Sequence, residues 1–220
     1  MTRAKTPARI LIVDDHPMMR EGLTTQICNA PDLAVCGEAD DVAEALRLVS
    51  ELNPDLVIID ISLKTGHGID LIKQIRGSHP KMKMLVNSMY DESVYAERSL
   101  QAGALGYLNK QTARETLIDA IHIVLAGKTY ISPAMTDRIL KSRIGGMIEP
   151  GKSPIESLSD RELEVLTLIG QGQTTSGIAR QLHLSVHTID TYREKLKLKL
   201  NLANSAELNR CAVQWVLENG

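Results

Sequence analysis

The first 128 residues alternate short apolar runs with longer amphipathic stretches, a pattern typical of strands alternating with helices. The apolar runs predict strands at 9–13, 33–39, 56–60, 82–88 and 105–109. The amphipathic stretches predict helices at 17–29, 41–52, 68–78, 91–102 and 112–127. We therefore expect β-α-β units, which assemble into a five-stranded parallel sheet with right-handed crossovers.

The pattern changes after Gly127, where strand-like runs end. Gly, Pro and Lys are dense over 144–154, which predicts a linker. The later helical periods predict four helices, near 160–171, 175–182, 186–200 and 204–218. The chain is thus expected to hold an α/β domain (1–128), a linker with one short helix (129–156) and an all-α domain (157–220).

Composition adds limits to this picture. The 220 residues carry a net charge of −2, so any contact with nucleic acid must come from a local patch. Aromatic residues make up 3% and Phe is absent, so the core must be aliphatic. The three cysteines, Cys28, Cys36 and Cys211, are widely spaced and predict reduced thiols in a cytoplasmic protein. No apolar stretch approaches the length of a membrane span, so no membrane association is expected.

Reactive side chains gather at the carboxyl ends of the predicted strands, where open parallel sheets bind ligands. In chain order they are Asp14, Asp15, Asp60, Ser88 and Lys110. Carboxylates this close repel one another unless a cation lies among them, and hard oxygen ligands suit Mg²⁺. An Asp carboxylate can also attack phosphorus and form an aspartyl phosphate. A hydroxyl and an ammonium group are then suited to hold the phosphoryl oxygens.

Four motifs in this domain, 13-VDDH-16, 57-VIIDISL-63, 86-VNSMYDE-92 and 106-GYLNK-110, resemble the receiver domain of two-component response regulators. The resemblance implies a flavodoxin-like (βα)5 fold. It implies Asp60 as phosphoacceptor and a Mg²⁺ site formed by Asp14, Asp15, Asp60 and the backbone carbonyl of Ser62, with Asp15 a direct ligand. It also implies Ser88 as switch hydroxyl, Tyr107 as switch aromatic and Lys110 as phosphate-binding lysine.

A rival enzyme class, the haloacid-dehalogenase-like phosphatases, also uses a strand-end Asp. Those enzymes need a second Asp two residues on, where this chain has Ser62. Two residues depart from the receiver pattern: Lys64 stands where Pro is common, and Asn87 interrupts an apolar strand. We expect His16, His67 and His79 at the surface.

The C-terminal region has its own signals. Ser159 and Glu162 have the spacing of a capping box at a helix start. Residues 175–200 predict a helix, a tight turn and a second helix capped by Ser185. Of the eight Lys and Arg residues in 152–220, four lie within 193–199, which suits a helix that contacts phosphates but also an ordinary solvated face.

The segments 158-LSDRELEVL-166, 178-IARQL-182, 185-SVHTID-190 and 198-LKLNLANSAEL-208 resemble the helix-turn-helix domain of the NarL/FixJ (LuxR-type) family. This implies a recognition helix in the major groove. The candidate DNA-contacting residues are Thr174, Thr175, Ser185, His187, Thr188, Asp190, Thr191, Arg193, Glu194, Lys195 and Lys197.

Among these, Asp190, Thr191 and Glu194 are candidate base readers, because a carboxylate can accept a hydrogen bond from cytosine N4. The basic residues at 193, 195 and 197 are candidate phosphate contacts. Many family members carry Lys where this chain has Asp190. The hydroxyls at 174 and 175 suit either phosphate contacts or simple helix capping.

The family uses its last helix for dimerisation, which implies Leu208, Cys211 and Trp215 as the dimer face, although Trp215 suits the domain core equally. The expected function is that of a DNA-binding response regulator, not an enzyme. A cognate histidine kinase would phosphorylate Asp60, and the protein would bind promoter DNA as a homodimer when phosphorylated or DNA-bound. A phosphorylation-independent DNA-binding or scaffold protein remains the alternative, and the helix-turn-helix disfavours a phosphotransfer-only receiver.

Overall fold

The computed structural model describes residues 6–111, 114–144 and 154–219. The chain forms two compact units, residues 1–141 and 142–220, and each is described by itself. Residues 145–153, which hold most of the predicted Gly- and Pro-rich linker, lie outside the described residues, as do 112–113 at the predicted start of one helix.

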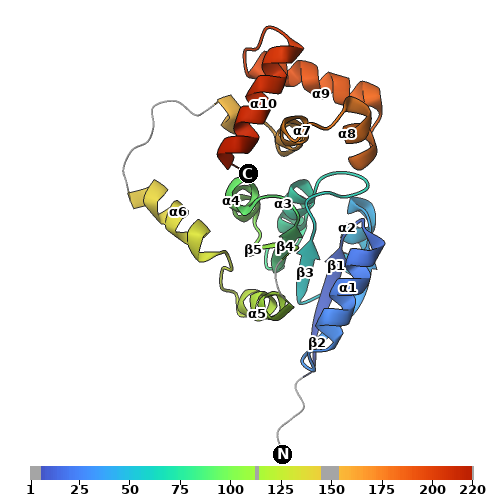
Figure 1. Cartoon of the computed structure of the whole chain (residues 1–220). Coiled ribbons are helices and arrows are strands. Elements are labelled where there is room, and N and C mark those ends of the chain that lie inside the picture. The colour runs from blue at the N-terminus through green and yellow to red at the C-terminus, as the bar shows by residue number, and fades with distance from the viewer. Residues whose placement is uncertain (1–5, 112–113, 145–153, 220) are drawn as a thin grey trace, which may run out of the picture. The chain divides into compact units, whose positions relative to one another are not determined.

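The first unit is built on a five-stranded parallel sheet, as predicted (Figure 1). Its strands are β1 Ala8–Val13, β2 Leu33–Ala39, β3 Leu56–Ile59, β4 Met84–Ser88 and β5 Gly106–Asn109. The strand order is β2-β1-β3-β4-β5, so the chain passes from one side of β1 to the other between β2 and β3. Such a reversal opens a crevice at the carboxyl ends of the two central strands, here β1 and β3.

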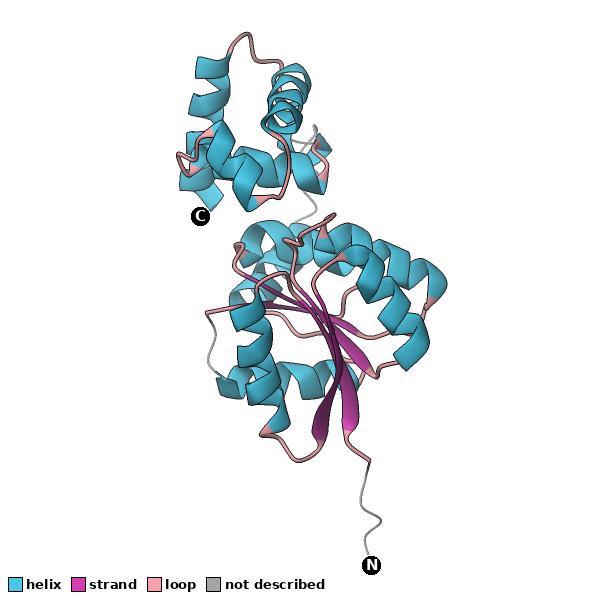
Figure 2. Ribbon diagram, turned by 90° about the vertical axis from the view of Figure 1, so that its right-hand side faces the viewer, coloured by secondary structure: helices cyan, strands magenta, loops and turns pink. Residues whose placement is uncertain are grey.

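Helices cover both faces of this sheet (Figure 2). Side chains of α1 (Pro17–Cys28) and α5 (Arg114–Leu125) form one core cluster with β1, β3, β4 and β5. The other helices are α2 (Val42–Leu52), α3 (Gly68–Ser78) and α4 (Glu92–Ala102). Helix α2 packs on β1 and β2, α4 packs on β5, and α3 packs against both of these helices. The largest fully buried side chains are aliphatic except for Tyr95 and Tyr107, as the composition predicted.

Short polar residues begin the helices around the sheet. The side chain of Asp41 accepts a hydrogen bond from Glu44 N–H at the start of α2 (2.8 Å). His67 does the same at α3, where its Nδ1 accepts from Ile69 N–H (3.3 Å). Because this capping ring is only 2% exposed, the prediction of a surface His67 is wrong.

The segment after α5 stays attached to the sheet. Tyr130 bridges Gly106 of β5, and its carbonyl accepts a hydrogen bond from Tyr107 N–H (2.9 Å). Ser132 N–H donates to the Glu92 carboxylate of α4 (2.8 Å). Helix α6 (Pro133–Ile144) follows and buries Met135. The structure thus groups residues 129–141 with the first unit, whereas the sequence pattern assigned them to the linker.

The second unit is all helical. It contains a short 3-10 helix η1 (Pro154–Ser157), then α7 (Asp160–Gly170), α8 (Thr175–Gln181), α9 (Val186–Lys199) and α10 (Ser205–Asn219). The predicted capping box at Ser159 and Glu162 is present. A Cβ on Gly170 would lie 2.2 Å from the Ala212 carbonyl oxygen, so only glycine allows α7 to pack this closely on α10. No helix in the described parts of the chain is long and apolar enough to cross a membrane.

Candidate functional site

Carboxylates from the two central strands meet at the carboxyl edge of the sheet. Asp14 and Asp15 directly follow β1, and Asp60 follows β3, which pairs with β1. The side chains of Asp14 and Asp60 are 2% and 4% exposed. Ligand atoms of these three residues and of His16 all lie within 4.8 Å of one another. The structure therefore brings together the acids that the sequence predicted at this edge.

Lys110 supplies the countercharge in this acidic pocket. Its Nζ lies 2.7 Å from Asp14 Oδ2 and 2.6 Å from Asp60 Oδ2, and the side chain is 2% exposed. Its backbone N–H donates to the Ser88 carbonyl (2.9 Å), which fixes the end of β5 against the end of β4. Burial opposes the ammonium charge, but Asp60 and Asp14 outweigh it and raise the pKa of Lys110. Lys110 therefore remains a cation inside the pocket.

The environment of Asp60 favours the neutral, protonated carboxyl group, whereas that of Lys110 favours the charged form. Burial raises the pKa of Asp60 to about 6; Lys110 and a hydrogen bond from Ser88 oppose this rise, and the negative charge of Asp14 adds to it. A carboxylate with this pKa is mainly ionised at neutral pH and can act as a nucleophile. A cation bound beside it would favour the ionised form further.

The loop after β3 packs tightly against Asp60. Asp60 Oδ1 accepts a hydrogen bond from Ile61 N–H (2.7 Å). Ser62 pairs with His67 in an isolated antiparallel bridge, where Gly68 N–H donates to the Ile61 carbonyl (2.7 Å). This bond uses the carbonyl of Ile61 and not that of Ser62, which the resemblance assigns to the metal. A Cβ on Gly68 would lie 2.1 Å from the Asp60 carbonyl oxygen, so glycine is required there.

Ser88 and Tyr107 lie inside the same edge of the sheet. Ser88 is fully buried, and its Oγ accepts from Tyr90 N–H at 3.4 Å. Tyr107 is 1% exposed and donates its hydroxyl to the Tyr90 carbonyl (2.8 Å). Burial raises the pKa of Tyr107 well above its usual value, so the hydroxyl keeps its proton. The two predicted switch residues thus share one partner in the loop between β4 and α4.

Lys64, at the position where receivers commonly have Pro, makes an ion pair with Asp40 (Nζ to Oδ2, 3.4 Å). Both side chains are substantially exposed, at 56% and 37%. The ammonium group is therefore engaged by the loop before α2. Exposed pairs of this kind contribute only about 0–1 kcal/mol to stability.

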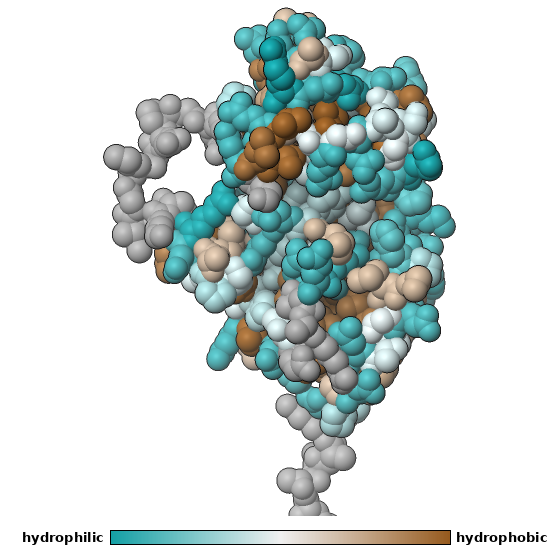
Figure 3. Space-filling model, in the orientation of Figure 1, coloured by the Kyte–Doolittle hydropathy of each residue, from teal (hydrophilic) through white to brown (hydrophobic). Residues whose placement is uncertain are grey.

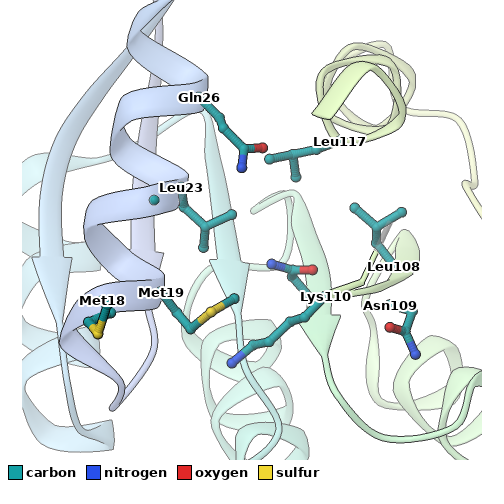
Figure 4. Close-up of a pocket in the computed structure, with 10 residues that line it drawn as sticks. Met18, Met19, Leu23, Gln26, Leu108, Asn109, Lys110 and Leu117 are labelled. Atoms are coloured by element: carbon teal, nitrogen blue, oxygen red, sulfur yellow. The ribbon is translucent and has the colours of Figure 1, made fainter. Parts of the chain in front are cut away.

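A small cavity of about 140 Å³ lies behind Lys110 between α1, the sheet and α5. Figure 4 shows Met19 and Leu23 of α1 facing Lys110, Leu108 and Leu117 across it. Asn87, the polar residue that interrupts β4, also lines this cavity and is 4% exposed. This placement explains how an apolar strand accommodates Asn87: its amide faces the cavity and not close-packed apolar side chains.

In the second unit, α9 presents polar side chains to solvent. Exposed residues include His187, Asp190, Thr191, Glu194 and Lys195, whereas Thr188, Arg193 and Lys197 are partly buried. Positions 187, 190, 191 and 194 are spaced three or four residues apart and so share one helix face. Three of these four, 190, 191 and 194, are the candidate base readers.

The basic residues of α9 have neighbours that hold them near this face. Arg193 donates to Asn209 Oδ1 of α10 (3.1 Å), and Lys197 Nζ lies 2.9 Å from Glu194 Oε1. Lys199 Nζ lies 2.7 Å from Glu162 Oε2 of α7, so this positive charge forms an ion pair that links α9 to α7.

Two hydroxyls predicted to contact DNA also cap helices. Thr174 Oγ1 accepts from Gly177 N–H (3.1 Å) at α8, and Ser185 Oγ accepts from Thr188 N–H (3.0 Å) at α9. Thr174 and Ser185 are both exposed, and Thr175, the first residue of α8, is partly buried. The capping role that the sequence left open for Thr174 is present.

One predicted dimer residue lies in the core. Leu208 is fully buried, as is Ala212 one helical turn later, and α10 packs there against α7. The assignment of Leu208 to a dimer face is therefore wrong, because the side chain is already used inside the domain. Cys211 and Trp215 are only partly buried.

A different stripe of α10 is apolar and exposed. Val213 is 44% and Leu217 79% exposed, and together with Asn209, Arg210 and Gln214 they line a shallow apolar hollow. Figure 3 shows hydrophobic side chains gathered over the C-terminal part of this helix. Sequence periodicity missed this face because α10 carries apolar residues on more than one side.

Comparison with known families matches both units. Residues 10–122 match the response regulator receiver domain, and residues 156–212 match the bacterial regulatory proteins of the luxR family. The chain is a response regulator of the NarL/FixJ family. This response regulator is 34% identical over 209 residues to the response regulator GacA of Pseudomonas aeruginosa, which covers 94% of this chain and 95% of that protein.

Other relatives match either nearly the whole chain or a large part of it. The oxygen regulatory protein NreC of Staphylococcus carnosus is 35% identical over 210 residues, covering 94% of this response regulator and 97% of NreC. Among solved structures, RcsB of Salmonella enterica bound to promoter DNA with the phosphate mimic BeF3⁻ has a TM-score of 0.60 at 26% identity, covering 93% and 98% of the two chains. A LuxR-family response regulator from Aurantimonas has a TM-score of 0.59 at 37% identity, covering 63% of this chain and 99% of that one.

Proposed function

We propose that phosphorylation of Asp60 by a cognate histidine kinase controls binding of promoter DNA by α9, and so transcription. The observation that carries the proposal is the buried contact of Lys110 with both Asp14 and Asp60 in a chain that also holds a helix-turn-helix unit. Such a pocket suits an acyl phosphate on Asp60. The second unit would then convert phosphorylation into a change in DNA binding. Because promoter DNA is the proposed partner, the proposed location is the cytoplasm.

In the proposed reaction, a carboxylate oxygen of Asp60 attacks the phosphorus of a phosphohistidine. A P–O bond to Asp60 forms as the P–N bond of the donor breaks, and the electron pair of that bond leaves with the imidazole. With acetyl phosphate as donor, the leaving group is acetate. The raised pKa of Asp60 still leaves most molecules ionised at neutral pH.

The acidic pocket fits a Mg²⁺ ion, because three carboxylates supply hard oxygen donors within 4.8 Å of one another. Asp14, Asp15, Asp60 and the Ser62 carbonyl would hold it. When bound, the ion would offset the negative charge that develops on the transferring phosphoryl group. Lys110 and Ser88 are the residues of this chain that would bind the phosphoryl oxygens.

The proposed switch uses the contacts around the loop between β4 and α4. Donation of the Ser88 hydroxyl to the phosphoryl group would move Oγ away from Tyr90 N–H, from which it now accepts a long hydrogen bond. Tyr107 contacts the same loop through the Tyr90 carbonyl. A change in this loop would alter the start of α4 and the surfaces around it.

For DNA, we propose that Asp190, Thr191 and Glu194 read bases while Arg193, Lys195 and Lys197 contact phosphates. The exposed positions at 190, 191 and 194 on one helix face support this division. Dimerisation through the exposed Val213 and Leu217 would align two copies of α9 on a two-fold symmetric site.

Labelling with acetyl phosphate and Mg²⁺ tests the first half of the proposal. We expect one phosphoryl group per chain in the wild type and in Asp70→Asn, an exposed control on α3, and none in Asp60→Asn. Equal labelling of Asp60→Asn would disprove the phosphoacceptor assignment.

Selection of bound sequences from random DNA, with and without acetyl phosphate, tests the second half. Enrichment of a symmetric site that strengthens with acetyl phosphate would support the proposal. Enrichment that is identical in both arms would favour a DNA-binding protein that does not depend on phosphorylation.

A further inference from the structure

His16 lies at the mouth of the acidic pocket, and neither the reaction nor the capping of α1 accounts for its side chain. It occupies the N-cap position of α1, yet its ring makes no capping hydrogen bond. Instead, Nδ1 lies 2.7 Å from Asp15 Oδ1 and 3.3 Å from Asp14 Oδ1. The side chain is 63% exposed, so the contact with the acids is not forced by packing.

The two Nδ1 separations are close to those of adjacent donor atoms around one metal ion. Donors bound at about 2.1 Å in an octahedron lie about 3.0 Å apart when adjacent and about 4.2 Å apart when opposite. The Nδ1 separations of 2.7 and 3.3 Å bracket the adjacent value. The four donor atoms of Asp14, Asp15, His16 and Asp60 all fall within 4.8 Å of one another, and the widest separation would shorten if all four bound one ion.

The rest of the pocket leaves this side open to a cation. Lys110 contacts Asp14 and Asp60 through their Oδ2 atoms, whereas His16 faces the Oδ1 atoms of Asp14 and Asp15. Asp14 Oδ1 also accepts the backbone N–H of His16 (2.9 Å), which holds the ring close to the pair. An ion on the Oδ1 side therefore meets two carboxylates and an imidazole without displacing the lysine.

We propose that His16 Nδ1 is a nitrogen ligand of the metal site, so that this pocket binds divalent transition-metal ions such as Co²⁺, Ni²⁺ or Zn²⁺ with a selectivity over Mg²⁺ that oxygen donors alone would not give. Imidazole suits these ions, whereas Mg²⁺ prefers oxygen and water. The inference rests on the proposed metal site at Asp14, Asp15 and Asp60. Its consequence is that transition-metal ions compete with Mg²⁺ for the phosphorylation pocket.

Titration of the full chain, purified without a histidine tag, with Co²⁺ and separately with Mg²⁺ tests this. We expect His16→Ala to weaken Co²⁺ binding by at least about tenfold, while Mg²⁺ binding changes by less than about threefold. In the Co²⁺ form, proton NMR should show a hyperfine-shifted, solvent-exchangeable imidazole N–H signal that His16→Ala removes. His79→Ala, which alters a histidine outside the pocket, should keep both the affinity and the signal.

His16→Ala should fold, because the side chain is exposed and makes no cap. An unchanged Co²⁺ affinity in His16→Ala, or an imidazole signal that persists in it, would overturn the inference. Failure of the proposed metal site itself has a different result: neither ion binds the wild type, or Asp15→Asn leaves the binding of both ions unchanged.

Discussion

The ammonium nitrogen of Lys110 lies 2.6 Å from a carboxylate oxygen of Asp60, and both side chains are almost fully buried. Despite this contact, burial raises the pKa of Asp60 to about 6. The buried pocket therefore disfavours the ionised form of Asp60. Functional pockets commonly hold groups with shifted pKa values in this way.

This shift makes stability depend on pH. The folded-state pKa of Asp60 exceeds its unfolded value of 3.8, so the folded protein binds more protons between about pH 4 and 6. Stability from this group is highest below that window and is lost as pH rises through about 6, by on the order of 3 kcal/mol. We expect urea unfolding in EDTA to show Asp60→Asn more stable than wild type at pH 7, with the difference shrinking towards pH 4. Parallel stability curves would contradict this expectation.

Gly68 and Gly77 of α3 offer a matched pair of substitutions. A Cβ at Gly68 meets Asp60 O at 2.1 Å and Ile61 Cα at 2.8 Å, and neither backbone atom can move cheaply. A Cβ at Gly77 meets nothing within 4 Å. We expect Gly68→Ala to destabilise the protein by more than about 2 kcal/mol and to reduce acetyl phosphate labelling. Gly77→Ala should raise stability by up to about 1 kcal/mol, because alanine favours the helix.

Chemical denaturation of the two variants beside the wild type measures both effects. Equal stabilities for Gly68→Ala and Gly77→Ala would show that the loop after β3 yields to the added methyl group.

Asn87 is a buried amide whose removal should stabilise the protein. It is 4% exposed, and within the described part of the chain no side-chain hydrogen bond to it is found. The amide adjoins the cavity and is not fully desolvated, so an apolar group of similar shape removes only part of a desolvation penalty of about 1–3 kcal/mol. We expect Asn87→Leu to raise the free energy of unfolding by up to about 1 kcal/mol.

Asn87→Ala serves as the comparison, because it removes the amide but enlarges the cavity of about 140 Å³. Its stability should fall below that of Asn87→Leu. A Leu variant less stable than wild type would mean that the amide is well solvated or bound in solution.

Leu208 and Leu217 of α10 should respond in opposite ways. Leu208 is fully buried, so Leu208→Ala should lower the free energy of unfolding by about 2–5 kcal/mol. Leu217 is 79% exposed, so Leu217→Glu should change stability by less than about 0.5 kcal/mol but weaken binding to a two-half-site DNA. Gel-shift titrations on full and half sites measure the second effect. Equal losses on both DNAs would argue against dimerisation through this stripe.

The strands and helices could be predicted because each has a sustained period of its own. β2 was predicted at its observed bounds, Leu33–Ala39, and the other strands differ by no more than two residues at either end. Parallel strands then bring Asp14, Asp60 and Lys110 to one edge, so the acidic pocket follows from strand ends alone. The strand order could not be predicted from the pattern, because an apolar run shows that a strand is buried but not which strands it pairs with.

The remaining differences come from contacts that periodicity does not encode. His67 is buried because its ring caps α3, a role that is more often filled by Ser, Thr, Asp or Asn. Tyr130 joins β5 through a single residue, which is too short to form a pattern. Leu208 and Leu217 are both apolar residues of one helix, and only the packing of α10 on α7 distinguishes core from surface.

The attachment of residues 130–132 has a mechanical consequence. The backbone of Tyr130 is bonded to β5, which leads into Lys110, and Ser132 N–H is bonded to Glu92 in the first turn of α4. The chain therefore departs for its C-terminal unit from a point anchored on the two elements that flank the switch residues. Because Ser132 directly precedes α6, a shift of α4 would displace the start of α6 as well.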